Sequence, residues 1–365
     1  MNVLVDRHHA GLLYSLQLLF EDRFGYDLYI PVGHEWWDEG IWRFGHGYGD
    51  DRLARQFLNL SDAELVLGPD DAIPAREAEP HQTGLYYTLR DLAEYPERII
   101  RCVTYEQFKN LGDWAYIVAT VQDNQPGFDA LAKTCGAKSV YQVGNTGQFV
   151  DWELDPLVLQ SSNGPLHGRG VVYHQEYEKD TTFRYRPPDS VDLYKIGSFV
   201  NCFEKAHTGT YEFFQAAVIE MLDFKFAVHG SDGADGKVYP CSKLATAMAT
   251  CGFAWHDKPS GDGFGHVIHY LASVGRPLIG HARYYNGQMA GPLWEDGYTC
   301  IDADKHDTQE MVRTLRSIVD NPDRHTRMCQ AIRERVDELV DFDAEAARIA
   351  EFLGVSQFRP SSPSL

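Results

Sequence analysis

Short apolar runs alternate with helical patterns along most of the chain. Asn2–Asp6 and Asp27–Pro31 are apolar runs, and Leu12–Phe20 between them has the spacing of a buried helix. Strand, loop, helix and strand in this order predict a βαβ unit, which requires parallel strands. Ligands bind at the carboxyl ends of such strands, and His8 and His9 directly follow the first one.

The same alternation continues to a polar stretch with a proline pair, Thr181–Asp189, which we interpret as a linker. Before it, strands are predicted at 114–120, 139–145, 157–160 and 171–174, and a helix at 127–136. After it, strands are predicted at 196–200, 226–230, 253–256, 277–280 and 298–301. Helices are predicted at 211–222, 243–251, 266–274 and 308–319, and a final amphipathic helix at 343–352.

This pattern predicts an α/β protein with two Rossmann-like, doubly wound domains that face a cleft. The expected domains are residues 1–185 and 186–340. Residues 341–356 would form a helix that crosses back to the first domain, and residues 357–365 a disordered tail.

An aromatic segment interrupts the first domain. Residues 33–49 read GHEWWDEGIWRFGHGYG, which fits neither a core helix nor an alternating strand. A long irregular loop of this kind is often functional, so we expect either a lid or a ligand-contacting loop. Asp123 follows the strand at 114–120 and is a further candidate. The candidate acceptor-binding residues are His34, Glu35, Trp36, Trp37, Trp42 and Asp123.

The net charge of −20 argues against a general nucleic-acid-binding protein unless arginines of the first domain converge locally. The seven cysteines are widely spaced without a CxxC pair, which indicates a reducing compartment. No signal peptide or membrane-spanning segment is recognisable, so a cytoplasmic protein is expected. No metal site is expected, because the two Asp-x-Asp triplets lie late in the chain and His8 and His9 lack further ligands.

The most informative segment is Lys258-Pro-Ser-Gly-Asp262-Gly-Phe-Gly-His266, a glycine-rich turn that opens a predicted helix. The first turn of a helix offers unpaired N–H groups and a positive dipole end, which suit a phosphate. Glycines also let the backbone approach a ligand closely. The segment therefore predicts a phosphate-facing site.

This segment resembles the donor-binding half of GT-B glycosyltransferases, in particular the retaining, family-4-like group with Glu-Gly-Phe-Gly before a helix that ends in Gly-x-Pro-Val-Ile. The resemblance covers Ile196 to about Phe352. It includes Gly197–Asn201, Gly275–Ile279 and Glu295–Asp302 in the family's order. It implies a hexose transfer from a nucleotide-diphosphate sugar of the UDP-glucose type, with retention and without a metal or a tightly bound cofactor.

By this resemblance, Asp262 stands at the first carboxylate of the family's pair, near the transferred sugar, and is a catalytic candidate with His8 and His9. Tyr270 stands where the family has the second carboxylate, which holds the ribose, and this departure implies an altered donor contact. Lys205 or Lys258 would neutralise the diphosphate. The full set of implied donor-binding residues is Ser198, Asn201, Lys205, Gly230, Lys258, Gly263, Phe264, Gly265, His266 and Tyr270.

The acceptor is the open question. The sequence is similar in style to bacteriophage glycosyltransferases that modify hydroxymethylated pyrimidines, so 5-hydroxymethylcytosine in DNA is the leading acceptor, with tryptophans to stack on an extruded base. A phage-encoded protein acting in the host cytoplasm would fit this reading. A protein or small-molecule acceptor stays open. So do a nucleotide-sugar-binding protein without activity, which Tyr270 favours, and a sugar epimerase of the same architecture.

Overall fold

The computed structural model describes residues 1–6, 10–31, 35–41, 98, 101–145, 147–164, 166, 168–356 and 358–360. For Ala10, Trp37, Asp38, Cys102 and Ser190 it describes the backbone alone. The chain divides into two compact units. Unit 1 comprises Met1–Tyr177 with Phe342–Ser362, and unit 2 comprises Glu178–Asp341.

Unit 1 is built on a parallel sheet with the strand order β3-β2-β1-β4-β5-β6-β7. Its chain order reverses direction between β1 and β4, so the helices that follow these two strands pack on opposite faces of the sheet, and ligands bind at this point in doubly wound sheets. The strands are β1 (Asn2–Val5), β2 (Asp27–Pro31), β3 (Arg101–Val103), β4 (Trp114–Ala119), β5 (Lys138–Val143), β6 (Leu157–Gln160) and β7 (Gly170–Val172).

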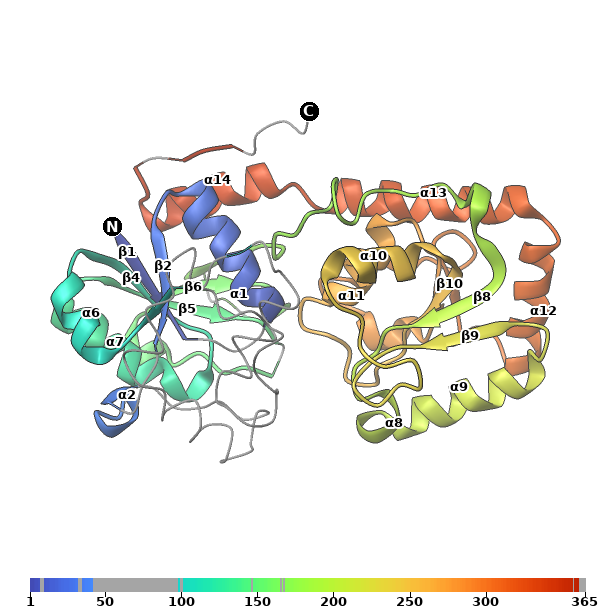
Figure 1. Cartoon of the computed structure of the whole chain (residues 1–365), viewed down its shortest axis with the longest axis horizontal. Helices are drawn as coiled ribbons and strands as arrows, with labels where there is room; N and C mark the ends of the chain where they lie inside the picture. The colour runs from blue at the N-terminus through green and yellow to red at the C-terminus, as the bar shows by residue number, and fades with distance from the viewer. Residues whose placement is uncertain are drawn as a thin grey trace. The chain divides into compact units, whose positions relative to one another are not determined.

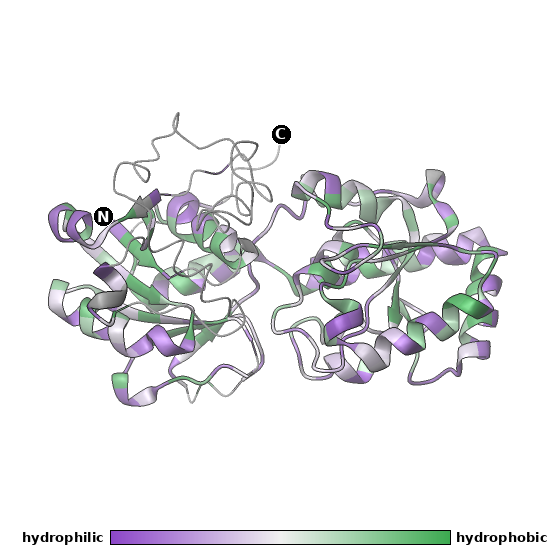
Figure 2. Ribbon diagram, turned by 60° about the horizontal axis from the view of Figure 1, so that its bottom comes forward, coloured by the Kyte–Doolittle hydropathy of each residue, from purple (hydrophilic) through white to green (hydrophobic). Residues whose placement is uncertain are grey.

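Helices cover both faces of this sheet (Figure 1). One face packs on α1 (Ala10–Gln17), the π-helical turn Leu18–Arg23 and α14 (Phe342–Leu353). The other packs on α2 (Glu35–Asp38), α6 (Tyr105–Leu111) and α7 (Gln125–Cys135). Figure 2 shows the hydrophobic residues of this unit gathered in its strands. A parallel sheet buried on both faces accounts for the nearly continuous apolar runs in the sequence.

Unit 2 is built on a second parallel sheet with the order β12-β11-β10-β8-β9. Its chain order reverses between β8 and β10, where Trp255 pairs with Ser198. The central strand β10 is buried along its whole length, as expected for a strand with a helical layer on each side. The strands are β8 (Asp192–Ser198), β9 (Lys225–Val228), β10 (Cys251–Trp255), β11 (Leu278–Gly280) and β12 (Cys300–Asp302).

The helices of unit 2 form two layers around this sheet. The layer of α9 and α12 encloses an apolar core that includes Phe214, Trp255 and Leu315. Helices α10, α11 and α13 lie together away from α9 in Figure 1. The helices are α8 (Phe203–Ala206), α9 (Thr208–Glu220), α10 (Cys241–Ala249), α11 (His266–Ser273), α12 (Thr308–Val319) and α13 (Pro322–Leu339).

Helix α14 returns the chain to unit 1 and completes its core. Its buried face contributes Ala346, Ile349, Ala350 and Leu353 to the layer that also contains α1. A buried arginine fastens the start of the helix, because Arg23 bonds both Glu176 and Asp343. Both chain ends of the described protein therefore belong to unit 1.

These observations confirm the prediction of two doubly wound α/β domains with a C-terminal helix that crosses back. Helix α13, the longest in the described part of the chain, was not among the predicted elements. Its buried stripe is interrupted by charges and includes His325 and Cys329, which weakens the apolar periodicity. Within the described part of the chain, no helix is long and apolar enough to cross a membrane.

Candidate functional site

The candidate site lies at the carboxyl ends of β8 and β10 in unit 2, where the strand order reverses. In doubly wound sheets this is the place where ligands bind. Strand β10 ends at Trp255 and is followed by His256, Asp257 and Lys258. The glycine-rich turn then leads into α11. The sequence pointed to the strand ends and to the glycine-rich turn as candidate sites. In the structure, both lie at one edge of the sheet.

Asp262 is the centre of this site. The Nε2 of His256 donates to its Oδ2 at 2.8 Å, and the Nζ of Lys258 forms an ion pair with its Oδ1. Its backbone N–H donates to the Oε1 of Gln288 at 2.8 Å. Burial raises the pKa of Asp262, but the bond from His256 and the charge of Lys258 outweigh this and hold the pKa below its ordinary value. Asp262 is therefore a carboxylate at neutral pH.

The turn around Asp262 requires glycine at two positions. Gly261 has φ +66°, and a Cβ there would clash with the Gln288 side chain. Gly265 has φ +81° and stands at the N-cap of α11, where no side chain caps the helix. A residue with a side chain would be strained at both positions. The uncapped N-terminus of α11 leaves its dipole end open to an anionic ligand.

The aromatic residues of the turn pack inward. Phe264 is buried and stacks on His269, with ring centroids 4.3 Å apart. The Nδ1 of His266 lies 3.1 Å from the hydroxyl of Tyr270, and burial lowers the pKa of His266 to about 4. His266 is therefore neutral at pH 7, so this imidazole would serve a ligand as a hydrogen-bonding group and not as a cation.

Tyr270 occupies the position at which the resembling family has its second carboxylate. It is buried, and its ring stacks on Phe183 with centroids 4.0 Å apart. Its hydroxyl is engaged with His266. A ribose contact from this position would therefore have to come from a hydroxyl that already has a partner.

The β8 side of the site carries the other predicted donor-binding residues. The Oγ of Ser198 is buried and has no hydrogen-bond partner among the described residues. Asn201 accepts a bond from the backbone N–H of Ser231 at 3.0 Å, and Gly230 lies so close to Val200 that a Cβ would meet its carbonyl at 2.5 Å. Asn201 and Gly230 therefore join the loops after β8 and β9. Lys205 is exposed on α8.

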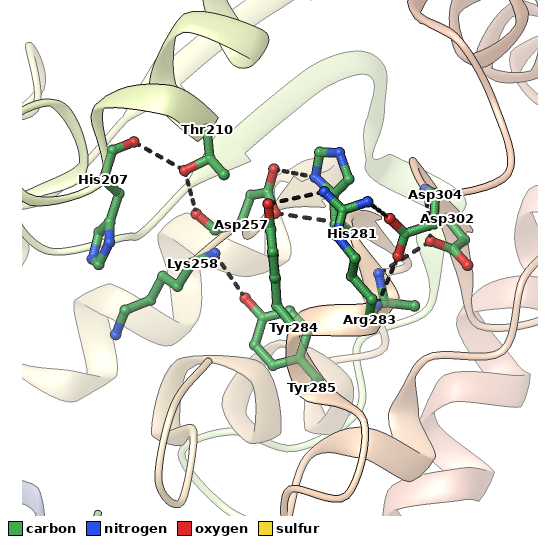
Figure 3. A network of polar contacts seen from close by, with 11 residues as sticks. His207, Thr210, Asp257, Lys258, His281, Arg283, Tyr284, Tyr285, Asp302 and Asp304 are labelled. Carbon is green, nitrogen blue, oxygen red and sulfur yellow. Dashed lines mark hydrogen bonds and ion pairs between the residues drawn. The ribbon is translucent and has the colours of Figure 1, made fainter. Parts of the chain in front are cut away.

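A second polar pair, shown in Figure 3, links the ends of β10 and β11. Asp257 is fully buried and accepts from the Nδ1 of His281 at 2.7 Å and from its backbone N–H at 3.3 Å. This bond orients the imidazole of His281. The hydroxyl of Thr210, on α9, lies 3.1 Å from the Asp257 carbonyl. The pair thus fastens α9 and β11 to the site.

Lys258 lies between these groups. Its backbone N–H donates to the hydroxyl of the buried Tyr285 at 3.1 Å. Its ammonium group is near His207, whose pKa is lowered by burial and by this positive charge (Figure 3). The Lys258 ammonium group and the N-terminus of α11 together make this edge of the sheet suitable for an anionic group.

The corresponding edge of unit 1 holds a different carboxylate, Asp6, directly after β1. It is fully buried and accepts bonds from the backbone N–H groups of Thr120 and Val121 and from the side-chain amide of Asn124 at 2.7 Å. Burial raises the pKa of Asp6 to about 6, although these bonds oppose the shift. Asp6 joins the loops after β1 and β4.

The catalytic and acceptor-binding candidates of unit 1 separate into three groups. Trp36 is fully buried, donates to the Val103 carbonyl at 3.1 Å and has no exposed ring face with which to stack a base. Glu35 and Asp123 are exposed. His8, His9, His34 and Trp42 lie outside the described residues, and the side chain of Trp37 is not described.

Several solved structures share this fold over nearly the whole chain. HepE from Anabaena, in complex with UDP, matches with a TM-score of 0.56 at 12% identity over 97% of this chain and 99% of that one. An alpha-glucosyltransferase in complex with UDP and a 13-mer DNA matches with a TM-score of 0.62 at 8% identity over 97% and 99%. Sucrose-phosphate synthase from Thermosynechococcus elongatus matches with a TM-score of 0.56 at 14% identity over 96% and 98%.

The chain has the GT-B fold. No protein-family model matches the sequence, and no curated protein sequence matches it. At these identities the likeness to solved structures establishes the GT-B architecture over the length of the chain.

Four residues of this site in unit 2 were not among the predicted site residues, namely His256, Asp257, His281 and Gln288. His256 is the last residue of the predicted strand 253–256 and Asp257 follows it, a position that favours ligand-facing residues and was a usable signal. Gln288 lies in a loop 26 residues after Asp262, and nothing in the local pattern connects the two. Among the described residues, no group of three or more His, Cys, Asp or Glu side chains is placed to hold a metal ion.

Proposed function

We propose that this protein is a glycosyltransferase that moves a hexose from a nucleotide-diphosphate sugar, of the UDP-glucose type, to an acceptor hydroxyl. The observation that carries the proposal is the Asp262 carboxylate, fixed by His256 and Lys258 beside the N-terminus of α11. A carboxylate accepts bonds from sugar hydroxyls, and a lysine with a helix N-terminus binds the diphosphate.

The reaction needs positive charge where the leaving group develops negative charge. The bond between the sugar C1 and the diphosphate oxygen breaks, and C1 forms a bond to the acceptor oxygen. Lys258 and the α11 N-terminus would stabilise the departing diphosphate, with Lys205 as a second cation. Such electrostatic stabilisation is often the largest contribution to catalysis.

We propose retention of configuration, in line with the family that the turn resembles. The departing phosphate oxygen then takes the proton of the acceptor hydroxyl, so that no protein base is required. His8 and His9 come shortly after β1 in the sequence and are proposed to contact the acceptor or the transferred sugar. No metal enters this scheme.

For the acceptor we propose a hydroxymethylated pyrimidine in DNA, such as 5-hydroxymethylcytosine. The neighbours of this fold include an alpha-glucosyltransferase in complex with UDP and DNA containing an HMU base, and HepE in complex with UDP-glucose. His34, Glu35, Trp37, Trp42 and Asp123 are the proposed contacts, and the burial of Trp36 removes it from this set. The reaction would take place in the cytoplasm, in a phage-infected host if the protein is phage-encoded.

Tyr270 favours one alternative, a protein that binds the donor and transfers nothing. Its buried ring replaces a carboxylate that the resembling family uses for the ribose. A donor-binding protein would bind a nucleotide sugar but would give no product with any acceptor. A transferase with a protein or small-molecule acceptor would consume the donor with those acceptors and leave DNA unchanged.

The deciding experiment incubates the protein with UDP-glucose and two duplexes that differ in one base, 5-hydroxymethylcytosine or cytosine. The DNA is then digested to nucleosides for mass spectrometry. We expect a product heavier by one hexose residue from the hydroxymethylated duplex alone. Nucleotide binding without any transfer, across donors and acceptors, would leave the donor-binding protein as the better description.

A matched pair of variants assigns the product to the proposed site. Asp262→Asn should lose the transfer, whereas Asp223→Asn should keep it. Asp223 pairs with Arg316 at 2.8 Å on the exposed surface of the same unit. Equal activity of the two variants would remove the transferase site from this edge of unit 2.

A further inference from the structure

Both oxygens of the Asp262 carboxylate are occupied by different kinds of partner. Oδ2 is held by His256, whose side chain is 2% exposed, and Oδ1 by Lys258, whose side chain is 23% exposed. His256 is a rigid, buried ring at a strand end. Lys258 reaches the carboxylate through four flexible methylene groups. The two partners therefore differ in how easily they can leave.

The remaining contacts of Asp262 hold it without Lys258. Its backbone N–H is bonded to Gln288 at 2.8 Å, and the preceding turn is fixed by a bond from the Gly261 N–H to the Lys258 carbonyl at 2.8 Å. The backbone of Lys258 is likewise fixed, by Tyr285 at 3.1 Å. The ammonium group can therefore swing away while the carboxylate and the backbone on both sides stay in place.

A donor sugar nucleotide makes conflicting demands on this pair. Its diphosphate requires the ammonium group of Lys258, and its sugar hydroxyls require an open acceptor on Asp262. Neither demand is fully met while the two side chains neutralise one another. The neighbouring His207 is a further polar group beside the ammonium, and His256 does not compete with either demand.

We propose that Lys258 exchanges partners during donor binding: it pairs with Asp262 in the unliganded protein and with the diphosphate in the donor complex. His256 acts as the positioning residue that keeps Asp262 in place, and Oδ1 then accepts a hydroxyl of the sugar. This proposal rests on the proposed function. By this exchange, the Lys258–Asp262 pair favours binding of the intact donor over binding of the nucleoside diphosphate product.

The two ligands differ in the contact that they offer to Asp262 once Lys258 has left it. A nucleoside diphosphate breaks the pair and leaves Asp262 without its cation. The intact donor breaks the same pair but supplies a hydroxyl to the carboxylate. Binding of the diphosphate is therefore opposed by Asp262, while binding of the donor is supported by it. After transfer, the return of Lys258 to Asp262 assists release of the diphosphate.

The test is isothermal titration calorimetry with the nucleoside diphosphates of uridine, guanosine, adenosine and cytidine, and with the glucose ester of whichever binds best. Wild type is compared with Asp262→Asn, Lys258→Met and the double variant, and with Asp223→Asn as the control. In Asp262→Asn we expect the diphosphate to bind roughly fivefold more tightly, because a partly buried ion pair no longer competes. The glucose ester should lose its advantage over the diphosphate in the same variant.

The other variants complete the cycle. Lys258→Met should weaken diphosphate binding, and the double variant should resemble Lys258→Met, since Asp262 opposes the diphosphate only through Lys258. Asp262→Ala provides a second way to release the lysine, and circular dichroism establishes that each variant is folded.

Unchanged or weaker diphosphate binding in folded Asp262→Asn and Asp262→Ala would overturn the exchange and leave the proposed function standing. Failure of every nucleotide to bind the wild type would overturn both.

Discussion

The two units each place an aspartate at the carboxyl edge of a parallel sheet, but the groups around the two carboxylates differ. Each carries an aspartate at the edge where its strand order reverses, Asp6 in unit 1 and Asp262 in unit 2. Asp6 is surrounded by neutral donors, and burial raises its pKa to about 6. Asp262 has a histidine and a lysine, and its pKa is lowered. The neutral donors around Asp6 connect two loops, whereas Asp262 has one rigid partner, His256, and one flexible cationic partner, Lys258.

The turns that follow differ in the same way. After β4, unit 1 continues through the 3₁₀ turn Gln122–Asn124, which contains no glycine and supplies a side chain to Asp6. After β10, unit 2 continues through the glycine-rich turn that leads into α11. Helices α7 and α11 both begin without a capping side chain. The two turns therefore differ in what they contribute: the first supplies Asn124 to the buried Asp6, whereas the glycine-rich turn supplies the Asp262 carboxylate itself.

The largest expected difference between the two aspartates concerns the rate of transfer. Asp262→Asn keeps the shape of the side chain but removes its charge, so we expect transfer to fall by about 10²- to 10³-fold, the loss typical for one preorganised polar group. The rate of product formation at saturating donor is the measurement. The equivalent exchange in unit 1, Asp6→Asn, should reduce the rate far less. A similar loss in both variants would mean that the two carboxylates share a role.

The pH dependence of stability should also distinguish Asp6 from Asp262. Because Asp6 has a raised pKa, the stability that it contributes is present below about pH 4 and is lost as the pH rises through about 6. The loss is at most about 3 kcal/mol. Asp262 has a lowered pKa and behaves in the opposite sense, since its contribution is present above its ordinary pKa and is lost as the pH falls below it.

Denaturant unfolding at pH 4, 5, 6 and 7 measures this difference. The free energy of unfolding of wild type relative to Asp6→Asn should decline over this range. The same difference for Asp262→Asn should stay flat here and change only in stronger acid. A flat profile for Asp6→Asn would show that its carboxyl is not held in the neutral form.

The smallest expected effect concerns the glycine-rich turn before α11. Gly265→Ala forces a side chain into φ +81°, with its Cβ 3.3 Å from that of Ala290. We expect a loss of about 1 kcal/mol in the free energy of unfolding, together with weaker nucleotide binding. Gly209→Ala is the control, because a Cβ there meets nothing within 4 Å and the residue lies in α9. Equal melting temperatures for the two variants would contradict the strain.

Local patterns predicted most of the elements but not their meeting points. The predicted spans Asp27–Pro31, Leu157–Gln160 and Thr308–Val319 coincide with β2, β6 and α12, because their periodicity and end signals agree. Helix α13 was missed, since its buried stripe is weak. Strand order and the contacts of Asp262 depend on which distant loops come together, and a single sequence carries no direct record of that.

The residues of the candidate site likewise divide into those that local sequence reveals and those that distant loops contribute. Asp262 and the glycines were recognisable because turn chemistry is local. Gln288 and His281 act on the site from other loops, 26 and 24 residues from their partners in the chain. The aromatic segment gave the reverse case: Trp36 looked like a ligand-stacking residue, and its indole instead packs between Tyr105 and Phe108 in the core.

The return of α14 to unit 1 has a consequence for the order in which the protein is made. On the ribosome, residues 1–177 emerge without the helix whose Ala346, Ile349 and Leu353 fill one layer of their core. All of unit 2 is synthesised in the interval. Unit 2 can therefore reach its native state first, as a continuous segment, whereas unit 1 must wait with an apolar surface open until the last helix leaves the exit tunnel.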